Sequence, residues 1–595
     1  MATQKPLVIG SGTTAQFPSV VGDSLEINGA VLAKNTANSL TAFQVQNAAG
    51  TVVLDVDTIN ARVGIGTSAP GAKLEVANSD ALVYGLTIGR GGGAVSSNTA
   101  VGASALAANA AGGTNNVAVG LNALAVNTTG VSNTALGRQT LAQNLAQSSN
   151  TAVGHLSQSK SGGSENTSVG VSSLDTNTGI RCVAVGVNAL QANTGSNCVA
   201  VGYNALDNNT GTANVAVGMN ALGAAVTGLS NVAVGFSALV ANTSGGSSVA
   251  VGAQALGSAT SGSNVGVGTA AGFNVTTGGV TTPNTALGIA ALGADTGSPG
   301  LTGDGNVAVG YSALGLLTGA TSSNTAVGAN AGPALTTGVN NTLVGNNALL
   351  LSTVALRCAV LGGSAASNVT PGPAHADSVA VGYNAEVGTT SLGQNTVVGA
   401  SAGGNITTGT GITLLGYNAE VSSGAAVTSN ATALGNGASV NANNKVRVGN
   451  TAVTVIEGQV NWSFPSDSRD KTDIVALPVD DAIAIMQALH PVQYRWDRRD
   501  WYDDGQRDGS KKAAELKSGF IAQELLALQQ TYPWLDVAND GDASSLSIST
   551  GNLIPVVIKA CQELAAQAEA ATARAIEAER RLDALEAALA ALQNP

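Results

Sequence analysis

Residues 98–102 read Asn-Thr-Ala-Val-Gly, and variants of this five-residue unit recur along most of the chain. The unit returns at residues 116–120, 133–137 and 150–154, with Val or Leu replacing Thr or Val in some copies. Its closing glycine continues up to Gly435 at intervals of mostly 16 or 17 residues. So short a period does not fit helical repeats, and it suits one turn of a β-solenoid carrying one or two short strands.

The alternation within the unit predicts that neighbouring side chains point to opposite faces of a strand. We expect the Thr/Val and Val/Leu positions inside the coil and the Ala and Gly positions on the opposite face, where another chain could approach closely. The closing glycine is expected to allow a turn that other residues resist, and the Asn residues to stack as hydrogen-bonded ladders. At ~4.8 Å per coil, about twenty coils predict a rod on the order of 100 Å.

Three cysteines take the Asn position of this ladder, namely Cys182, Cys198 and Cys358, each four residues before a repeat glycine. Cys182 and Cys198 lie one coil apart and are expected side by side. The sequence leaves open whether they form a disulfide or remain two thiols.

The composition is unusual for a globular enzyme. The chain has 595 residues, of which 3% are aromatic and 10% charged, whereas globular chains carry about 25% charged residues. The formal net charge of −12 offers no basic patch for nucleic acid or an anionic membrane. No run of 18 apolar residues predicts a membrane span, and residues 1–20 do not resemble a signal peptide. The three histidines are far apart, so we predict no metal and no cofactor.

Acidic residues are too sparse in the repeats to predict a glycosidase. Glycan hydrolysis needs two carboxylates about 5 to 10 Å apart, and no two acids in the array lie at one-coil spacing. Its aromatic residues are single rather than clustered. We therefore expect the array to space or contact a receptor, with a glycan-degrading tailspike as an alternative.

The N-terminal segment reads as a set of short strands. Alternating apolar residues predict them at residues 24–27, 50–56, 62–67 and 73–76, with a turn at residues 70–71 between the last two. The last two strands resemble the entry to the shaft in many phage and bacterial fibre proteins. Because a fibre needs a base, we assign particle attachment to this segment, with a simple β-rich cap on the repeats as the alternative.

Beyond residue 460 the chain becomes charged, aromatic and helical in pattern. We predict a helix at residues 479–489 that ends at Pro491, a strand at 492–496 and a helix at 519–530. A small core is expected from Trp496, Trp501, Phe520 and Trp534.

Residues 554–592 show an unbroken heptad seam. Its apolar positions alternate in steps of three and four: Ile554, Val557, Cys561, Leu564, Ala568, Ala571, Ala575, Ala578, Leu582, Leu585, Leu589 and Leu592. This length favours a self-associating coiled coil over a helix that packs only on its own domain.

The junction between the two halves is residues 466–474, Ser-Asp-Ser-Arg-Asp-Lys-Thr-Asp-Ile. It places Ser466 and Lys471 five residues apart, and serine–lysine pairs are a known form of activated nucleophile. The lysine becomes a base where burial or a neighbouring cation, here Arg469, lowers its pKa.

This junction resembles that of the endosialidase-type intramolecular chaperones, autocatalytic Ser-Lys peptidases that end many phage tail fibres and tailspikes. The hallmark S-D-x-R-x-K-x-D-I is matched by Ser466, Asp467, Arg469, Lys471, Asp473 and Ile474. Residues 490–496 and 519–525 match two further blocks in order. The resemblance implies a domain that trimerises, helps the upstream fibre fold and cuts itself off at Ser466, with Ser466 as nucleophile and Lys471 as base.

Two bonds remain candidates for the cut. Within one chain, Ser466 can attack the Pro465 carbonyl in an N-to-O acyl shift. Attack on its own carbonyl would close a strained four-membered ring, so cutting between Ser466 and Asp467 would need another chain or an activated water.

The repeats resemble the heads of trimeric autotransporter adhesins, which implies three parallel β-rolls around one axis. We therefore divide the chain into an attachment region (1–96), a shaft (97–450), a linker (451–465) and a self-cleaving chaperone (466–595). The fold class expected is mainly β, a trimeric β-solenoid shaft followed by an α+β domain with a long coiled-coil helix.

The sequence thus predicts a homotrimeric phage tail fibre, made in the host cytoplasm and carried on the virion. Its N-terminus would bind the phage tail or baseplate, and a host receptor, glycan or protein, would be contacted at a region that the sequence does not specify. Two alternatives stay open besides the tailspike: a bacterial surface adhesin with the same chaperone, and a permanent trimer cap whose serine–lysine pair is inactive.

Overall fold

The computed structural model describes residues 43–47, 49–77, 80–84, 86–260, 262–276, 283–293, 300–367, 375–386, 391–422, 429–459, 465–502, 505–539 and 546–593. The chain is mainly β and divides into two units, residues 1–253 and 254–595. No helix in the described ranges is long and apolar enough to cross a membrane.

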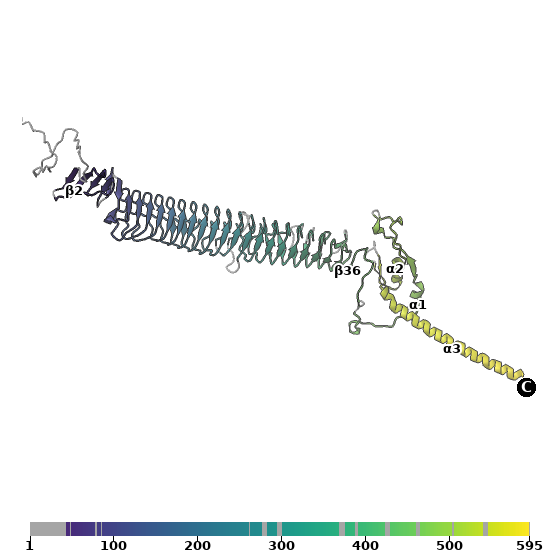
Figure 1. Cartoon of the computed structure of the whole chain (residues 1–595). Helices are drawn as coiled ribbons and strands as arrows, with labels where there is room; N and C mark the ends of the chain where they lie inside the picture. The colour runs from purple at the N-terminus through teal and green to yellow at the C-terminus, as the bar shows by residue number, and fades with distance from the viewer. Residues whose placement is uncertain are drawn as a thin grey trace, which may run out of the picture. The chain divides into compact units, whose positions relative to one another are not determined.

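Unit 1 begins with a four-stranded sheet in the order β1-β2-β3-β4, of which β2 is labelled in Figure 1. Its strands are β1 (Phe43–Gln46), β2 (Val52–Asp57), β3 (Arg62–Ile65) and β4 (Leu74–Val76). The last three confirm the strands predicted at 50–56, 62–67 and 73–76, whereas the strand predicted at 24–27 lies outside the described residues. The hairpin of β5 (Ala81–Val83) and β6 (Leu86–Gly89) follows, and β6 pairs antiparallel with the first solenoid strand.

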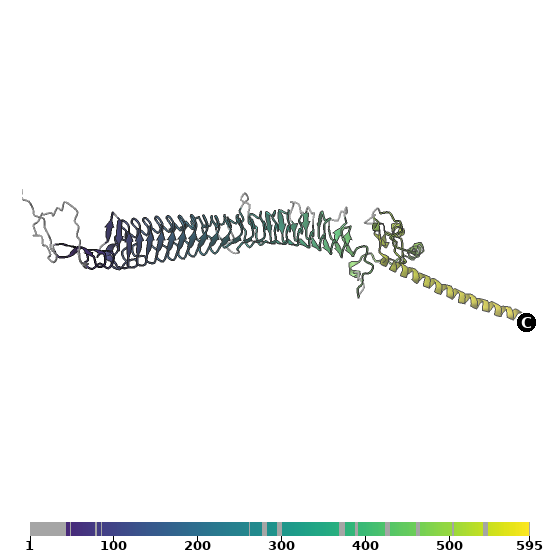
Figure 2. The same cartoon turned by 45° about the horizontal axis from the view of Figure 1, so that its top comes forward.

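The rest of unit 1 is a β-solenoid, confirming the fold predicted from the repeat. Its coils stack side by side in Figures 1 and 2, and each strand pairs in parallel with the equivalent residues of the next coil, as Val183–Val185 does with Val199–Val201. The main ladder consists of β7 (Thr99–Val101), β8 (Val117–Val119), β9 (Thr134–Leu136), β10 (Thr151–Val153), β11 (Thr167–Val169), β12 (Val183–Val185), β14 (Val199–Val201), β16 (Val215–Val217), β17 (Val232–Val234) and β18 (Val249–Val251). A second, short pair is formed by β13 (Ala192–Asn193) and β15 (Asn208–Asn209).

The side chains inside each coil are the reverse of those expected. The central Ala of the strand is fully buried, as at Ala184 and Ala200, while the flanking Val or Thr residues point outward and are partly or fully exposed. The interior is filled instead by a residue four positions after the closing glycine, which is leucine in most coils of unit 1, such as Leu190 and Leu206. Because this leucine occupies the coil's narrow interior, the facing strand position has room only for a small side chain.

The glycine that closes each strand adopts the conformation expected of it. Gly186 and Gly202 have φ angles of 133° and 140°. A Cβ on Gly186 would lie 2.4 Å from the carbonyl oxygen of Gly202 in the next coil. Glycine is therefore required both by the backbone angle and by the close stacking of coils.

The asparagine ladders are present. Asn133 Oδ1 accepts from the backbone N–H of Asn150 at 3.0 Å, and Asn150 Oδ1 accepts from that of Asn166 at the same distance. Cys182 takes the next place, where its N–H donates to Asn166 Oδ1. These side chains are buried, so the ladder satisfies backbone groups that the turns leave unpaired.

Unit 2 contains further solenoid coils. Their main ladder consists of β19 (Val265–Val267), β20 (Thr285–Leu287), β21 (Val307–Val309), β22 (Thr325–Val327), β24 (Thr342–Val344), β26 (Ala359–Leu361), β28 (Val379–Val381), β30 (Thr396–Val398), β32 (Thr413–Leu415), β34 (Ala431–Leu434) and β36 (Lys445–Val448). A second ladder contains β23 (Thr337–Val339), β25 (Val354–Leu356), β27 (His375–Ala376), β29 (Ser391–Gly393) and β31 (Thr408–Thr410), and β33 (Glu420–Val421) pairs with β35 (Ser439–Val440). At one place in these coils, large and small residues exchange positions. Leu343 replaces the central Ala of a strand, and Gly332 replaces the interior leucine of the preceding coil. A Cβ on Gly332 would lie 2.6 Å from the Leu343 side chain.

Unit 2 ends in an α+β region. Its elements are α1 (Val479–Ala488), β37 (Val492–Tyr494), β38 (Lys517–Gly519), α2 (Ala522–Thr531), β39 (Ala538–Asn539), β40 (Ser547–Ile548) and α3 (Ile554–Gln593), with 3-10 turns at Ser468–Asp470, Arg499–Trp501, Pro533–Leu535 and Thr550–Leu553. The helices α1 and α2 are those predicted, except that α2 begins at Ala522, because Gly519 belongs to β38 and Phe520 and Ile521 precede the helix. Strands β37 and β38 pair antiparallel.

The core of this region is aliphatic, not aromatic. It gathers Ala482, Ile485, Leu525, Leu535, Val537, Ala538, Leu553, Val556 and Ala560, with Phe520 partly buried against it. Trp496 and Trp534 are each 48% exposed, so the expectation that tryptophans form the core is wrong for these two. Each instead makes an edge-to-face contact with a nearby tyrosine, Tyr494 and Tyr532.

The helix α3 is 40 residues long. Its first turns pack against α1 through Val556 and Ala560, which are not positions of the predicted seam. The seam itself faces away from the core, and its leucines are exposed from Leu564 to Leu592.

Candidate active site

A single 3-10 turn brings the predicted nucleophile and base together. The turn spans Ser468–Asp470 and begins at Asp467, whose Oδ1 accepts from the backbone N–H of Arg469 at 2.9 Å. Lys471 closes it by donating its backbone N–H to the Ser468 carbonyl at 3.3 Å. The chain thereby folds back, and Lys471 Nζ lies 2.5 Å from Ser466 Oγ.

Asp467 also forms an ion pair with Arg469. The guanidinium donates from Nε to Oδ1 at 3.0 Å and from Nη2 to Oδ2 at 2.5 Å. This pair holds the pKa of Asp467 below its ordinary value and raises the pKa of Arg469. Both side chains are solvent-accessible, so the pair shapes the turn more than it stabilises the fold. The sequence had suggested Arg469 as the cation beside Lys471, and the structure gives it Asp467 as partner.

Within one chain, Ser466 and Lys471 lie at hydrogen-bond distance from each other, but both side chains are exposed to solvent. Lys471 Nζ donates to Ser466 Oγ, whereas a general base must accept the hydroxyl proton. Both side chains are exposed, and a lysine acts as a base where burial or a neighbouring cation lowers its pKa. For Lys471 to act as the base, the dyad would have to be buried by another segment or another copy of the chain.

The remaining motif residues flank this turn. Pro465 is exposed directly before Ser466. Asp473 has a φ angle of 53°, a left-handed conformation that is uncommon for residues other than glycine. The next two side chains, Ile474 and Val475, are 70% and 85% exposed, which places an apolar surface directly after the dyad.

The other two matching blocks also meet in the fold. Strand β37 lies in the first block and pairs with β38, whose last residue, Gly519, begins the second block. His490 Nδ1 lies 3.4 Å from Glu524 Oε1. This pair was not predicted from the sequence, although each partner lies in one of the quoted blocks. An ion pair forms there when His490 is protonated, and it links the end of α1 to α2.

The solenoid cysteines are free thiols. The neighbouring Cys198 thiol lowers the pKa of the Cys182 thiol to about 7, while Cys182 and burial raise the pKa of Cys198. Asn193 and Asn209 donate to the two sulfur atoms at 3.5 and 3.3 Å. The thiols therefore replace amides within the ladder, at the place that the sequence predicted.

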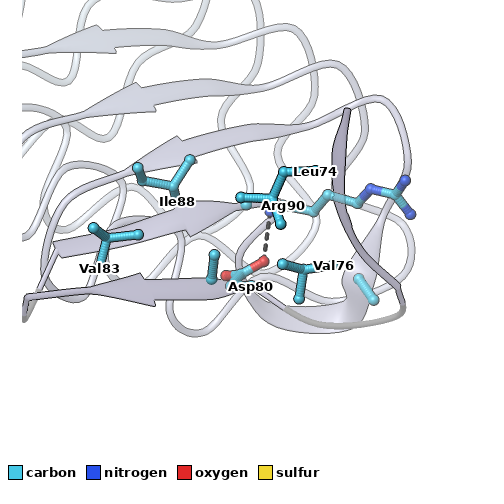
Figure 3. A pocket seen from close by; sticks show the side chains of 9 residues that line it. Leu74, Val76, Asp80, Val83, Ile88 and Arg90 are labelled. Carbon is cyan, nitrogen blue, oxygen red and sulfur yellow. Dashed lines mark hydrogen bonds between the residues drawn. The ribbon is translucent and has the colours of Figure 1, made fainter. Parts of the chain in front are cut away.

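A cavity of about 340 Å³ lies in unit 1 between β4 and the β5–β6 hairpin. It is lined by Leu74, Val76, Asp80, Ala81, Val83, Ile88, Gly89, Arg90 and Ala94. Asp80 accepts from the backbone N–H of Arg90 at 2.6 Å, while the Arg90 guanidinium points away from it (Figure 3). The Asp80 carboxylate is thus occupied by backbone amides, and the residues that line the cavity include no nucleophile beside a base.

Comparison with known proteins identifies the C-terminal region. A family model, Peptidase_S74, chaperone of endosialidase, matches residues 466–533. The match begins at Ser466 and includes Lys471, α1, β37, β38 and α2. A search among curated proteins finds no match to the chain. Downstream of its β-solenoid coils, the chain therefore carries an intramolecular chaperone domain of the Peptidase S74 type, a self-cleaving family.

Proposed function

We propose that the chain is a subunit of a homotrimeric phage tail fibre, made in the host cytoplasm and carried on the virion. The S74 domain brings three copies together, sets the folding of the upstream coils and then releases itself at Ser466. The N-terminal region would attach to the phage tail or baseplate, and a host receptor, a glycan or a protein, would be contacted elsewhere on the fibre. The observation that carries the proposal is the contact of Lys471 with Ser466 at the first residue of the S74 match.

The proposed cut starts with proton transfer. An unprotonated Lys471 Nζ takes the proton of Ser466 Oγ, and Oγ attacks the Pro465 carbonyl carbon. The Pro465–Ser466 amide breaks as the ester to Oγ forms, and the Ser466 nitrogen leaves as an amine after accepting a proton. Water then hydrolyses the ester, leaving a shaft that ends at Pro465 and a tail that begins with Ser466. Cutting after Ser466 requires another chain's nucleophile or an activated water.

Association of copies supplies what the single chain lacks. The exposed seam of α3 is long enough for a coiled coil, and the exposed Ile474 and Val475 lie beside the dyad. Packing of copies over this surface would bury Lys471 and favour its neutral form. Cleavage would then follow assembly, so only assembled fibres would lose the chaperone.

The test is the intact mass of the purified full-length protein beside Ser466→Ala and Lys471→Ala. Wild type should split into fragments of 465 and 130 residues if the first bond is cut, while both variants stay whole. Ser468→Ala, two residues away in the same turn, is the matched control and should split like wild type. The N-terminal residue of the tail names the bond. A wild-type trimer that remains uncut would refute self-cleavage and leave the domain as a permanent assembly cap.

A further inference from the structure

The outer face of the solenoid ladder is an apolar stripe. The first and third residues of each strand point away from the coil interior, and in unit 1 the third residue is Val or Leu in every strand of the main ladder from β7 to β18. Leu136 is 48% exposed, and Val169, Val185 and Val201 are 37–40% exposed. We call this row of third residues the outer row.

A second row of side chains widens the stripe. The residue after the closing glycine is exposed and is often large and apolar, as at Val187, Tyr203, Met219 and Phe236. Arg138 and His155 interrupt this second row, but no charged residue interrupts the outer row in unit 1. The coils of unit 2 show the same pattern, with Leu287 in its outer row and Tyr311 after a closing glycine, both exposed.

Parallel sheets in proteins are covered on both faces. Here the interior leucines cover the inner face of the ladder, while the outer face presents apolar side chains to solvent. A contiguous apolar surface of this kind marks an interaction site. The turn side of the same coils is different, because Thr178 and Thr194 are exposed there, one per coil.

The repeat indicates which partner fits the stripe. Apolar side chains recur once per coil, at a rise of ~4.8 Å, so a partner must repeat at the same rise to stay in register over many coils. A second copy of this chain, lying parallel, meets that requirement along the whole ladder. We propose that copies of the chain pack against each other through the outer row and the residues after the closing glycines. This places the contact on the Val/Leu positions, not on the Ala positions favoured by the sequence.

The proposal rests on the proposed function in one respect: the S74 domain brings the copies together. The test therefore reads shaft association and tail cleavage separately. Val185→Lys with Val201→Lys places two charges on the outer row of neighbouring coils. Thr178→Lys with Thr194→Lys adds the same charge to the turn side of the adjoining turns and is the matched control.

Light scattering gives the mass of each shaft, and the N-terminal residue of the tail reports cleavage. We expect wild type and the threonine variant to keep the same multiple-copy mass, and the shaft of the valine variant to fall to the mass of a single copy while its tail is still cut. An unchanged shaft mass in the valine variant overturns the outer-row contact, whatever the cleavage result. Uncut tails in all proteins refute the proposed self-cleavage, and the shaft masses still decide the contact.

A second measurement covers the case in which charged variants do not fold. In a Cys561→Ser background, which removes the exposed native thiol, Tyr203→Cys and Thr194→Cys each add one exposed thiol. A short thiol cross-linker should join copies through residue 203 and not through residue 194. Cross-linking through 194 alone would show that copies meet on the turn side and would overturn the proposal.

Discussion

Lys471 touches Ser466 because one short turn shortens a five-residue spacing to a direct contact. Lys471→Arg tests whether the contact is catalytic, because a guanidinium keeps the charge and the donor but does not lose its proton at accessible pH. We expect a cleavage rate lower by roughly 10²–10⁴-fold, the usual contribution of a general base, with assembly unchanged. A time course of tail release on a denaturing gel measures it.

Lys512→Arg is the control for that substitution, since Lys512 is an exposed lysine of the same region. It should be cut at the wild-type rate. If Lys471→Arg is also cut at that rate, the lysine only positions the serine and another group takes the proton.

Glu386 is a buried acid in the interior row of the solenoid. It is 1% exposed and takes the position that leucine holds in other coils. Its Oε1 has no hydrogen-bond partner, and burial raises its pKa from 4.5 to about 8 in spite of a hydrogen bond from Asn395. The corresponding positions of the neighbouring coils are Ala366 and Gly403, small residues that leave room for the longer side chain.

This burial predicts a pH-dependent stability. The folded state holds the proton of Glu386 up to about pH 8, whereas the unfolded chain loses it near pH 4.5. Stability from this group is therefore full below pH 4.5 and falls as pH rises to 8, by on the order of 4 kcal/mol. Glu386→Gln should remove that loss, so its melting temperature should exceed that of wild type at pH 8 by more than it does at pH 5.

The exposed Glu165 provides the comparison. Glu165→Gln makes the same chemical change on the solenoid surface and should leave the pH dependence as in wild type. Parallel melting curves of wild type and Glu386→Gln between pH 5 and 8 would contradict a neutral buried acid.

At the scale of elements, the periodicity of the repeat predicted the coil but not which side chains fill the coil interior. Alternation in Asn-Thr-Ala-Val-Gly assigns Ala and Val to opposite faces without saying which face is buried. Greater hydrophobicity favoured Val, but the interior leucines, such as Leu190, fill the space, and only Ala184 and its equivalents fit opposite them. The glycines and the ladder were predictable because each follows from local backbone chemistry.

The terminal helix was predicted almost to the residue, because a seam of this length has few alternatives. Its intramolecular contact was not, since Val556 and Ala560 lie off the seam. The prediction of a tryptophan core was also wrong for Trp496 and Trp534, which lie at the surface. Aliphatic residues from α1, α2 and α3 form the core instead.

The exposed seam of α3 predicts an assembly defect. Leu582→Glu with Leu589→Glu places two charges on one edge of the seam and should abolish association of the uncut chain in a Ser466→Ala background. Ala573→Glu with Ala587→Glu adds the same charges at positions opposite the seam and should not. Sedimentation of the full chains measures both.

In a chain that keeps Ser466, the two leucine changes should also suppress tail release, because in the proposed mechanism the dyad becomes buried only when copies associate. Normal cleavage by a dissociated leucine variant would show that one chain suffices for the reaction and that the exposed dyad is already active.

At the scale of the whole molecule, the sequence was most informative in the simple repeat and in the short, specific junction at residues 466–474. The repeat predicted the solenoid through its period alone, and the nine residues from Ser466 to Ile474 predicted the S74 domain, which the family match confirms. What the sequence could not provide is burial between copies, because Val185, Leu582 and Lys471 are all exposed in one chain. The heptad seam predicted that copies associate, but it does not locate the contacts at Val185 and Lys471 on which their proposed roles depend.

A detachable chaperone has a consequence for refolding. Parallel copies of a regular solenoid can pair in many registers, so correct assembly is slow unless one end fixes the register first. In the proposed assembly, the S74 domain would do this by holding the copies at high effective concentration, and its release would leave a kinetically trapped fibre. We expect the cut wild-type shaft, purified from its tail and unfolded in guanidinium, to regain little associated mass on dilution.

The uncut Ser466→Ala chain, treated in the same way, should recover at least roughly tenfold more associated shaft at equal concentration, because its chaperone is still covalently attached. Ser468→Ala, which is expected to be cut, should behave like wild type and so separates loss of the tail from the effect of a serine substitution. Equal recovery of cut and uncut shafts would mean that the coils set their own register, and that the tail is removed for some reason other than trapping the assembled fibre.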